Sequence, residues 1–283
     1  MSETTYDFND GNGLVPAHQH PNGGGWVADT ATVADTAYVG RTARVYDNAH
    51  VYGNAMIVGN AHVCGDAEVY GTARVYDNAK VYDTARVYDN AKVYGNTRVY
   101  GEAWVYGNAH VGDTARVYGN AHVYGDAHVY GNAHVGDTAG VYETARVYGE
   151  AWVYGNAQVC GDAKVCGNAH VYGNAMIVGN AHVCGNAHVC GNAVVGGKAW
   201  IYGNTRVYGE ARVYDNEQVY GDEPQTPSDP SQKERIAELE EAIRVLADTV
   251  VVFWTSADFV RHSDSLTHAR KNPIVCRAID EAR

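Results

Sequence analysis

The sequence contains few of the residues that fill an ordinary globular core. Phe occurs 3 times, Met 3 times and Pro 6 times in 283 residues, and Leu and Ile are rare before residue 235. Tyr (22) and Gly (32), together with Val, Ala and Asn, dominate instead. This composition excludes a mixed hydrophobic core for most of the chain and indicates an internal repeat.

Three further absences limit the function. No run of 18 apolar residues is present, so we expect no transmembrane helix and no membrane partner. The segment Met1–Phe8 lacks the basic and apolar parts of a signal peptide, so we expect a cytoplasmic protein with six reduced cysteines. The net charge is −12, which makes a nucleic-acid partner unexpected.

An unbroken six-residue repeat occupies residues 26–222. Val recurs at every sixth position from Val27 to Val219, which makes 33 repeats without an insertion. Only Ile57, Ile177 and Ile201 replace it. Ala lies two residues earlier in nearly every repeat, and the consensus is Ala-x-Val-Tyr-Gly-Asn.

The period predicts one short strand and one bend per repeat. Ala and Val are two residues apart, so in a strand both side chains point to the same side. Pairs such as Gly-Asn, Asp-Asn and Asp-Thr then tolerate the positive φ of a corner. A single strand cannot bury its Val alone, so coils must stack, and the sequence predicts a parallel β-solenoid.

This pattern resembles the left-handed β-helix hexapeptide superfamily. In that family three hexapeptides form one triangular coil of 18 residues, which implies about 11 coils and a rod of about 50 Å. The expected fold is therefore an all-β solenoid, a left-handed parallel β-helix with a small C-terminal helical tail. The left hand and the triangle are implied by the resemblance.

Residues 1–25 are expected to form an N-terminal cap. Asp7-Phe8-Asn9-Asp10 and the later Gly23–Val27 segment are similar to the opening segment of YdcK-like hexapeptide proteins, which are described as acyltransferases. Pro16, Pro21 and the glycines favour an irregular loop. His18 and His20 are interpreted as polar residues of the cap.

The C-terminal part has a different pattern. Residues 223–232 are rich in Pro and polar side chains and predict a linker. Within residues 233–283, apolar residues recur at spacings of three and four and predict a helix: Ile236, Leu239, Ile243, Leu246 and Val250. This segment is either a cap on the last coil or a device for homotrimer formation or partner docking.

Histidines of the repeat supply the candidate catalytic residues. Nine occupy the outward position before Val, and an 18-residue coil would stack His110 on His128 and His170 on His188. Related folds use His between subunits for acyl transfer or, in the carbonic-anhydrase branch, for zinc. The same position also holds Arg44, Lys80, Arg116, Lys164 and Gln158, which favours a solvated surface, and no metal site is expected.

Two features argue against catalysis. No loop leaves the coil, whereas acyltransferases of the family build their acceptor pocket from such loops. Trp104, Trp152 and Trp200 recur at an interval that is not a multiple of 18, so a copied block would move to another face. A catalytic site needs fixed geometry.

The remaining outward positions are rich in Tyr and Cys. Tyr follows Val in 20 repeats, which predicts stacked ladders or an adhesive surface for a protein or glycan. Cys166 and Cys184 lie 18 residues apart, within the range for a disulfide, although free thiols replacing Tyr are favoured. Acidic residues cluster at the corners and are expected to neutralise the basic outward positions locally.

The sequence therefore favours a structural or interaction protein, a rigid spacer or scaffold without catalysis or cofactor. It would associate with itself or with a protein partner through the C-terminal helix or the Tyr-rich faces. The alternative is a trimeric acyltransferase that uses acyl-CoA, and a third possibility is a zinc enzyme of the carbonic-anhydrase type. In the acyltransferase, His110, His128, His170 and His188 are the first candidates for a general base, whereas the zinc enzyme would need His from two subunits.

Overall fold

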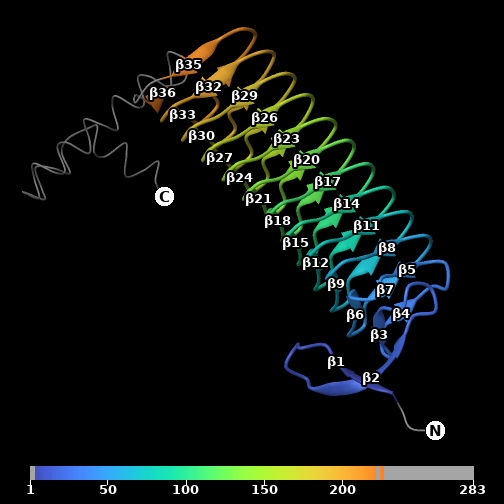
Figure 1. Ribbon diagram of the computed structural model, residues 1–283. Helices are drawn as coiled ribbons and strands as arrows, with labels where there is room; N and C mark the ends of the chain where they lie inside the picture. Colours follow the sequence, from blue (N-terminus) through green and yellow to red (C-terminus); the bar gives the residue numbers. More distant parts are fainter. Residues whose placement is uncertain (1–3, 221–223, 226–283) are drawn as a thin grey trace, which may run out of the picture. The chain divides into compact units, whose positions relative to one another are not determined.

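A stack of short β-strands wound about one axis forms the folded part of the protein. The computed structural model describes residues 4–220 and 224–225 (Figure 1). Every regular element in these residues is a strand. Each hexapeptide supplies one strand, usually two residues long, that consists of the outward residue and the following Val.

The strands form three parallel sheets with one constant register. Arg98 lies opposite Arg116 and Val99 opposite Val117, so partners are 18 residues apart. Every third strand joins the same sheet, and two of the sheets have 11 strands. The predicted parallel solenoid of about 11 three-strand coils is therefore confirmed.

We call the sheets face I, face II and face III in the order in which the chain meets them. Face I contains β3 (Trp26–Ala28), β6 (Arg44–Val45), β9 (His62–Val63), β12 (Lys80–Val81), β15 (Arg98–Val99), β18 (Arg116–Val117), β21 (His134–Val135), β24 (Trp152–Val153), β27 (His170–Val171), β30 (His188–Val189), β33 (Arg206–Val207) and β36 (Pro224–Gln225).

Face II follows face I along each coil. It contains β4 (Thr32–Val33), β7 (His50–Val51), β10 (Glu68–Val69), β13 (Arg86–Val87), β16 (Trp104–Val105), β19 (His122–Val123), β22 (Gly140–Val141), β25 (Gln158–Val159), β28 (Met176–Ile177), β31 (Val194–Val195) and β34 (Arg212–Val213).

Face III completes the coil. It contains β5 (Tyr38–Val39), β8 (Met56–Ile57), β11 (Arg74–Val75), β14 (Lys92–Val93), β17 (His110–Val111), β20 (His128–Val129), β23 (Arg146–Val147), β26 (Lys164–Val165), β29 (His182–Val183), β32 (Trp200–Tyr202) and β35 (Gln218–Tyr220).

The interior is one continuous core of Val and Ala. From Ala37 to Ile201, the Val or Ile and the Ala of each repeat are fully buried, apart from the Ala position taken by Thr97. The buried Thr97 donates its hydroxyl to the carbonyl of Tyr94 at 2.6 Å, and Thr205 donates to Tyr202 at 2.7 Å. A buried hydroxyl without a hydrogen-bond partner would be destabilising, and the hydroxyls of both Thr97 and Thr205 have one.

The corners need a left-handed backbone, and two residue types supply it. Gly101 has φ +70, where a Cβ would lie 2.9 Å from the nitrogen of Gly119. Asp83 adopts φ 59, and its carboxylate accepts the N–H of Gly101 in the next coil at 3.0 Å. Six other corner carboxylates make the same bond to the glycine one coil further on: those of Asp47, Asp77, Asp89, Asp113, Asp137 and Glu143.

A β-hairpin covers the first coil, where the sequence predicts an irregular loop. Strands β1 (Thr5–Asp7) and β2 (Leu14–Gln19) are antiparallel, and β2 also pairs with β3. Phe8, Ala17 and Ala28 form a second small core here. Pro16 lies within β2, where it has no N–H to donate and its carbonyl accepts the N–H of Asp29.

At the other end, face I extends into the predicted linker. Pro224 and Gln225 pair with Arg206 and Val207. The helix predicted within residues 233–283 lies outside the described residues.

Candidate functional site

The four candidate histidines form two stacked pairs on different faces. His110 lies opposite His128 on face III, with ring centroids 4.7 Å apart, and His170 lies opposite His188 on face I at 4.9 Å. The predicted stacking is therefore correct. The structure does not bring the two pairs together in one site.

The environment lowers the pKa of three of these four histidines, which keeps the three rings neutral at pH 7. Burial and the charge of Lys92 lower the pKa of His110. The pKa of His128 is lowered by burial and by Arg146, and that of His188 by burial, His170 and Arg206. Neutral imidazole can act as a base. Within the described residues, however, no carboxylate or hydroxyl forms a hydrogen bond that orients any of the four rings.

A metal site is not formed by the described residues. Among residues 4–220, no three His, Cys, Asp or Glu side chains are grouped closely enough to hold an ion. Two stacked imidazoles alone fall short of the three protein ligands typical of a catalytic zinc.

Tyrosines form ladders beside the corners. Tyr70, Tyr88, Tyr106, Tyr124 and Tyr142 stack in succession along face II, with ring centroids 4.8 to 4.9 Å apart. Faces I and III carry shorter ladders, which Gly136, Gly112 and cysteines interrupt. Burial raises the pKa of Tyr106, so the hydroxyls remain protonated donors at neutral pH.

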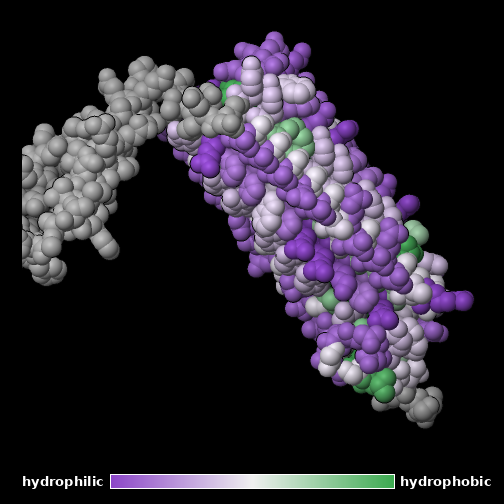
Figure 2. All heavy atoms as spheres, turned by 60° about the vertical axis from the view of Figure 1, so that its left-hand side comes forward, coloured by the Kyte–Doolittle hydropathy of each residue, from purple (hydrophilic) through white to green (hydrophobic). Residues whose placement is uncertain are grey.

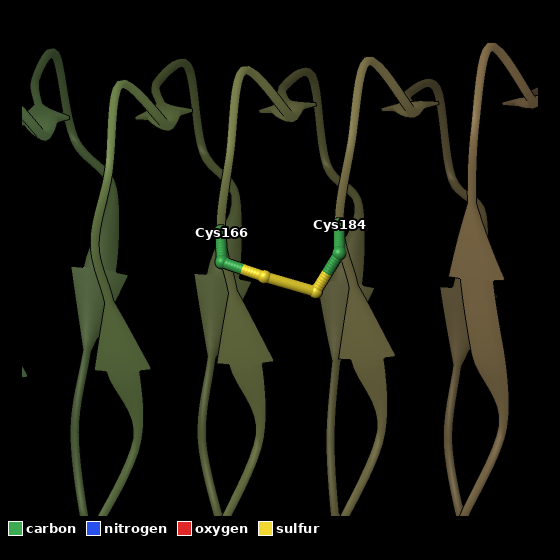
Figure 3. Close-up of a disulfide and its surroundings, with 2 residues drawn as sticks. All are labelled: Cys166 and Cys184. Atoms are coloured by element: carbon green, nitrogen blue, oxygen red, sulfur yellow. A yellow bond between two sulfur atoms is a disulfide. The ribbon is translucent and has the colours of Figure 1, made fainter.

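Cysteines occupy the Tyr position in five repeats, and two of them are bonded. Cys166 and Cys184 form a disulfide that joins neighbouring coils of face III (Figure 3). The expectation of reduced thiols is therefore wrong for this pair, because in-register coils place the two Cα atoms 4.6 Å apart. Cys64, Cys160 and Cys190 are free.

The outward positions of faces I and III form continuous basic columns, which sequence reasoning interpreted only as solvated positions. We define column I as Arg44, His62, Lys80, Arg98, Arg116 and His134. We define column III as Arg74, Lys92, His110, His128, Arg146, Lys164 and His182. The signal that could have found them was the recurrence of basic residues every 18 positions.

The local neutralisation expected for these columns does not take the form of direct ion pairs, although the charge of Asp126 partly offsets the lowering of the pKa values of His110 and His128. In the described solenoid, the one Lys or Arg in an ion pair is Arg86 on face II, 3.3 Å from Glu68. The carboxylates of the corners bond backbone N–H groups instead, as Asp83 does with Gly101. Cationic side chains in columns I and III therefore lie above one another without a carboxylate partner.

Face II differs from faces I and III in the cause of its histidine pKa shift. On face II, burial alone lowers the pKa of His122. On face I, burial lowers the pKa of His62 to about 4 with contributions from Lys80 and Arg44. Burial and Arg116 lower the pKa of His134, and burial and Lys164 lower the pKa of His182. The basic columns thus create a positive field along two faces.

Column III also borders a shallow groove of about 490 Å³. Arg146, Lys164 and His182 line one side, and the corner residues Thr144, Asp162 and Asn180 line the other. The carboxylate of Asp162 accepts the hydroxyl of Thr144. The groove is polar and follows the column.

The visible surface is mostly hydrophilic, with scattered apolar residues (Figure 2). Trp104, Trp152 and Trp200 lie on faces II, I and III respectively, which confirms that copied blocks change face. Among residues 4–220 and 224–225 there is no helix that could cross a membrane.

Comparison with protein families supports this architecture. The family model described as the YdcK beta solenoid repeat matches residues 49–65, 85–101, 115–131 and 169–185. With its coils of constant register, the chain is a β-solenoid repeat protein, as the resemblance implied. A comparison with curated proteins gave no match.

Proposed function

We propose that this β-solenoid is a structural or interaction protein, a rigid left-handed β-helical spacer or scaffold that performs no catalysis. The observation that carries the proposal is the constant register. The same pairing continues from Trp26–Arg44 to Trp200–Gln218, and within residues 26–220 no loop leaves the coil to form a pocket. A rod of this construction holds its surfaces at fixed spacings.

The rotation of copied blocks supports the same function. Trp104 contacts His122 on face II, whereas Trp152 stacks between His134 and His170 on face I. A catalytic constellation would lose its geometry when moved to another face. Surface character, such as charge or aromatic content, is retained.

Several ladders would stiffen such a rod. Asn60, Asn78 and Asn96 are joined by side-chain hydrogen bonds of 3.1 Å, and Val packs on Val through the core. Stacked amides and aromatic rings stabilise parallel in-register strands. Bending the axis would break several of these contacts in each coil.

Self-association and cellular location belong to the proposal. The Tyr ladder of face II and residues 233–283 are the proposed contacts with another copy or a protein partner, and homotrimers are the proposed assembly. The proposed location is the cytoplasm. That location must accommodate the Cys166–Cys184 disulfide, because disulfides in a reducing compartment are usually transient or catalytic.

The test uses the full chain and two matched variants. His110→Gln/His128→Gln removes a stacked pair, and His50→Gln/His122→Gln removes two histidines that do not stack on each other. We expect zinc well below one ion per chain, no saturable binding of acetyl-CoA by calorimetry, and similar thermal midpoints for all three proteins. Stoichiometric zinc, or acetyl-CoA binding that only the stacked-pair variant loses, would replace the scaffold with the zinc enzyme or the acyltransferase.

A further inference from the structure

Columns I and III place like charges in direct register. Arg98 lies opposite Lys80 and Arg116, all three are exposed, and none has a carboxylate partner among the described residues. Like charges directly opposite one another destabilise a sheet. A counter-charge that lies along the column would remove this repulsion.

Acidic side chains are distributed away from the edge between faces III and I. Along that corner the described acids are Asp77, Asp113 and Glu150. Glu68 lies on face II itself, and the two corners that border face II carry most of the others: Asp29, Asp35, Asp47, Asp66, Asp83, Asp89, Glu102, Asp126, Asp137, Glu143, Asp162, Glu210 and Asp215. The solenoid is therefore negative around face II and positive along the opposite edge, although its net charge is negative.

Amides lie between the two columns. Asn60, Asn78 and Asn96 form one ladder on the III–I corner, and Asn168 donates to Asn186 further along it. The ladder uses one N–H of the Asn78 amide, and an amide has two. The remaining N–H groups suit hydroxyl oxygens of a ligand.

We propose that faces I and III, with the corner between them, bind a linear anionic polysaccharide that lies along the solenoid axis. The Arg and Lys side chains would bind its carboxylate or sulfate groups through charge-assisted hydrogen bonds. The Asn ladder would contact the sugar hydroxyls. The charged side chains of Lys80, Arg98 and Arg116 lie in successive coils of column I, about 4.8 Å apart along the axis. The histidines of both columns are neutral at pH 7, because burial and neighbouring cations lower their pKa values.

The stacking of tryptophans on histidines leaves few open aromatic faces for the bases of a single-stranded nucleic acid. Binding of single strands uses open aromatic faces on which bases stack. The faces of Trp152 are covered by His134 at 4.1 Å and His170 at 6.0 Å between centroids. His182 covers one face of Trp200 at 4.5 Å.

Polysaccharide binding would add a ligand to the proposed scaffold, and the two proposals are tested independently of each other. If no polysaccharide binds, the rod and its zinc and acyl-CoA tests are unaffected. If polysaccharide binds, the solenoid presents a binding surface that needs a column of charge in constant register rather than a catalytic constellation.

The test measures binding to the full chain by calorimetry at low and high salt. The probes are a heparin decasaccharide for sulfate, a polygalacturonate decasaccharide for carboxylate, neutral dextran, and a single-stranded DNA 20-mer. Arg98→Gln/Arg116→Gln removes two charges from column I. The matched control Arg86→Gln/Arg212→Gln removes two charges from face II.

We expect at least one anionic decasaccharide to bind, no binding of dextran, and weakening by high salt. The column I variant should bind about tenfold more weakly, while the face II variant changes less than about twofold. Equal weakening in both variants, or no binding by either decasaccharide, would overturn the proposal. Tight binding of DNA alone would assign the columns to nucleic acid. A solution mass above one chain, lowered only in the column I variant and with no probe bound, would assign them to a second copy.

Discussion

Faces II and III share one interior and differ outside. Both bury the same Ala and Val positions in the same core. Face III presents a basic residue in every coil from Arg74 to His182, whereas face II mixes Glu68, Arg86, Trp104 and neutral residues beside its Tyr ladder. The repeat therefore constrains the inward side chains, and the outward ones are free to give each face its own binding chemistry.

The largest expected effect tests whether the interior is equivalent on all faces. Val129→Asp on face III buries an unpaired carboxylate and should lower the free energy of unfolding by about 4 kcal/mol or more. Val123→Asp on face II should have a similar effect. His128→Asp, on the adjacent outward position, should change stability by less than about 1 kcal/mol. Denaturant unfolding followed by circular dichroism measures all three, and a large difference between the two faces would contradict a shared interior.

A disulfide interrupts the Tyr ladder of face III, whereas the Tyr ladder of face II has none. Cys166→Ala/Cys184→Ala opens an 18-residue loop and should lower the free energy of unfolding by about 3 kcal/mol. Cys166→Tyr/Cys184→Tyr should recover about 1 kcal/mol through ring stacking. Unchanged denaturation midpoints on reduction would show that the bond is dispensable.

Tyrosine substitutions compare a long ladder with a short one. Tyr106 stacks on both Tyr88 and Tyr124, whereas Tyr148 stacks on Tyr130 at 5.1 Å. Tyr106→Leu should destabilise by about 1–3 kcal/mol and Tyr148→Leu by about half as much, because each stacked pair contributes about 0.5–1.5 kcal/mol. Equal losses in thermal or denaturant unfolding would show that burial, not stacking, holds the ladder.

Arginine substitutions should change the free energy of unfolding in opposite directions on face II and on face I. Arg86 pairs with Glu68 and lies 5.0 Å from the ring centre of Trp104, so Arg86→Gln should destabilise by about 0.5–1 kcal/mol. Arg98→Gln removes repulsion and should stabilise by about 0.5 kcal/mol at low salt. Both changes in the free energy of unfolding should become smaller at high salt. A destabilising effect of Arg98→Gln would show that the cations of column I do not repel one another.

Histidine titration compares the faces through the dependence of stability on pH. The pKa of His62 is lowered from 6.5 to about 4, so the unfolded chain takes up its proton first. The stability contributed by neutral His62 is present above pH 6.5 and is lost as the pH falls toward 4. Protonation must also overcome the charges of Lys80 and Arg44, the neighbours that lower this pKa besides burial.

Added salt separates the faces in the same experiment. Screening of Lys80 and Arg44 should raise the pKa of His62 in NMR titrations. His122 on face II should shift much less, because burial alone lowers its pKa. Equal shifts at the two histidines would show that the columns create no distinctive field.

The solenoid could be predicted from the sequence because its core positions are nearly invariant. Val and Ala at a spacing of two specify the inward side, and Gly or Asp supplies the corner conformation, as at Gly101 and Asp83. The stacking of His110 on His128 follows from the 18-residue coil. The structure of the N-terminal cap was harder to predict, because a hairpin that contains Pro16 depends on the pairing of β2 with β3.

The surface could be predicted only in part, because side-chain direction at the corners is not encoded by spacing. Asp83 lies near the basic positions in sequence, yet its carboxylate bonds the Gly101 N–H. Proximity of Cys166 and Cys184 was predictable, but spacing does not specify oxidation state. Basic columns became evident only when the register was known.

The central claim is that coils are interchangeable inside while outward columns carry the binding function. Deleting residues 121–138 removes one whole coil, takes no Lys or Arg from either column and preserves every face. Deleting residues 121–126 also keeps the core pattern but moves all later strands to another face, which carries Arg146 and Lys164 from column III to face II and brings Gly140 and Gln158 into the line of column I. Both deletions are made in the full chain, and both proteins should fold. The chain that lacks a whole coil should still bind the heparin decasaccharide, and the chain with the shorter deletion should bind it more weakly. Equal binding by both, or unfolding of the chain that lacks the whole coil, would contradict the account.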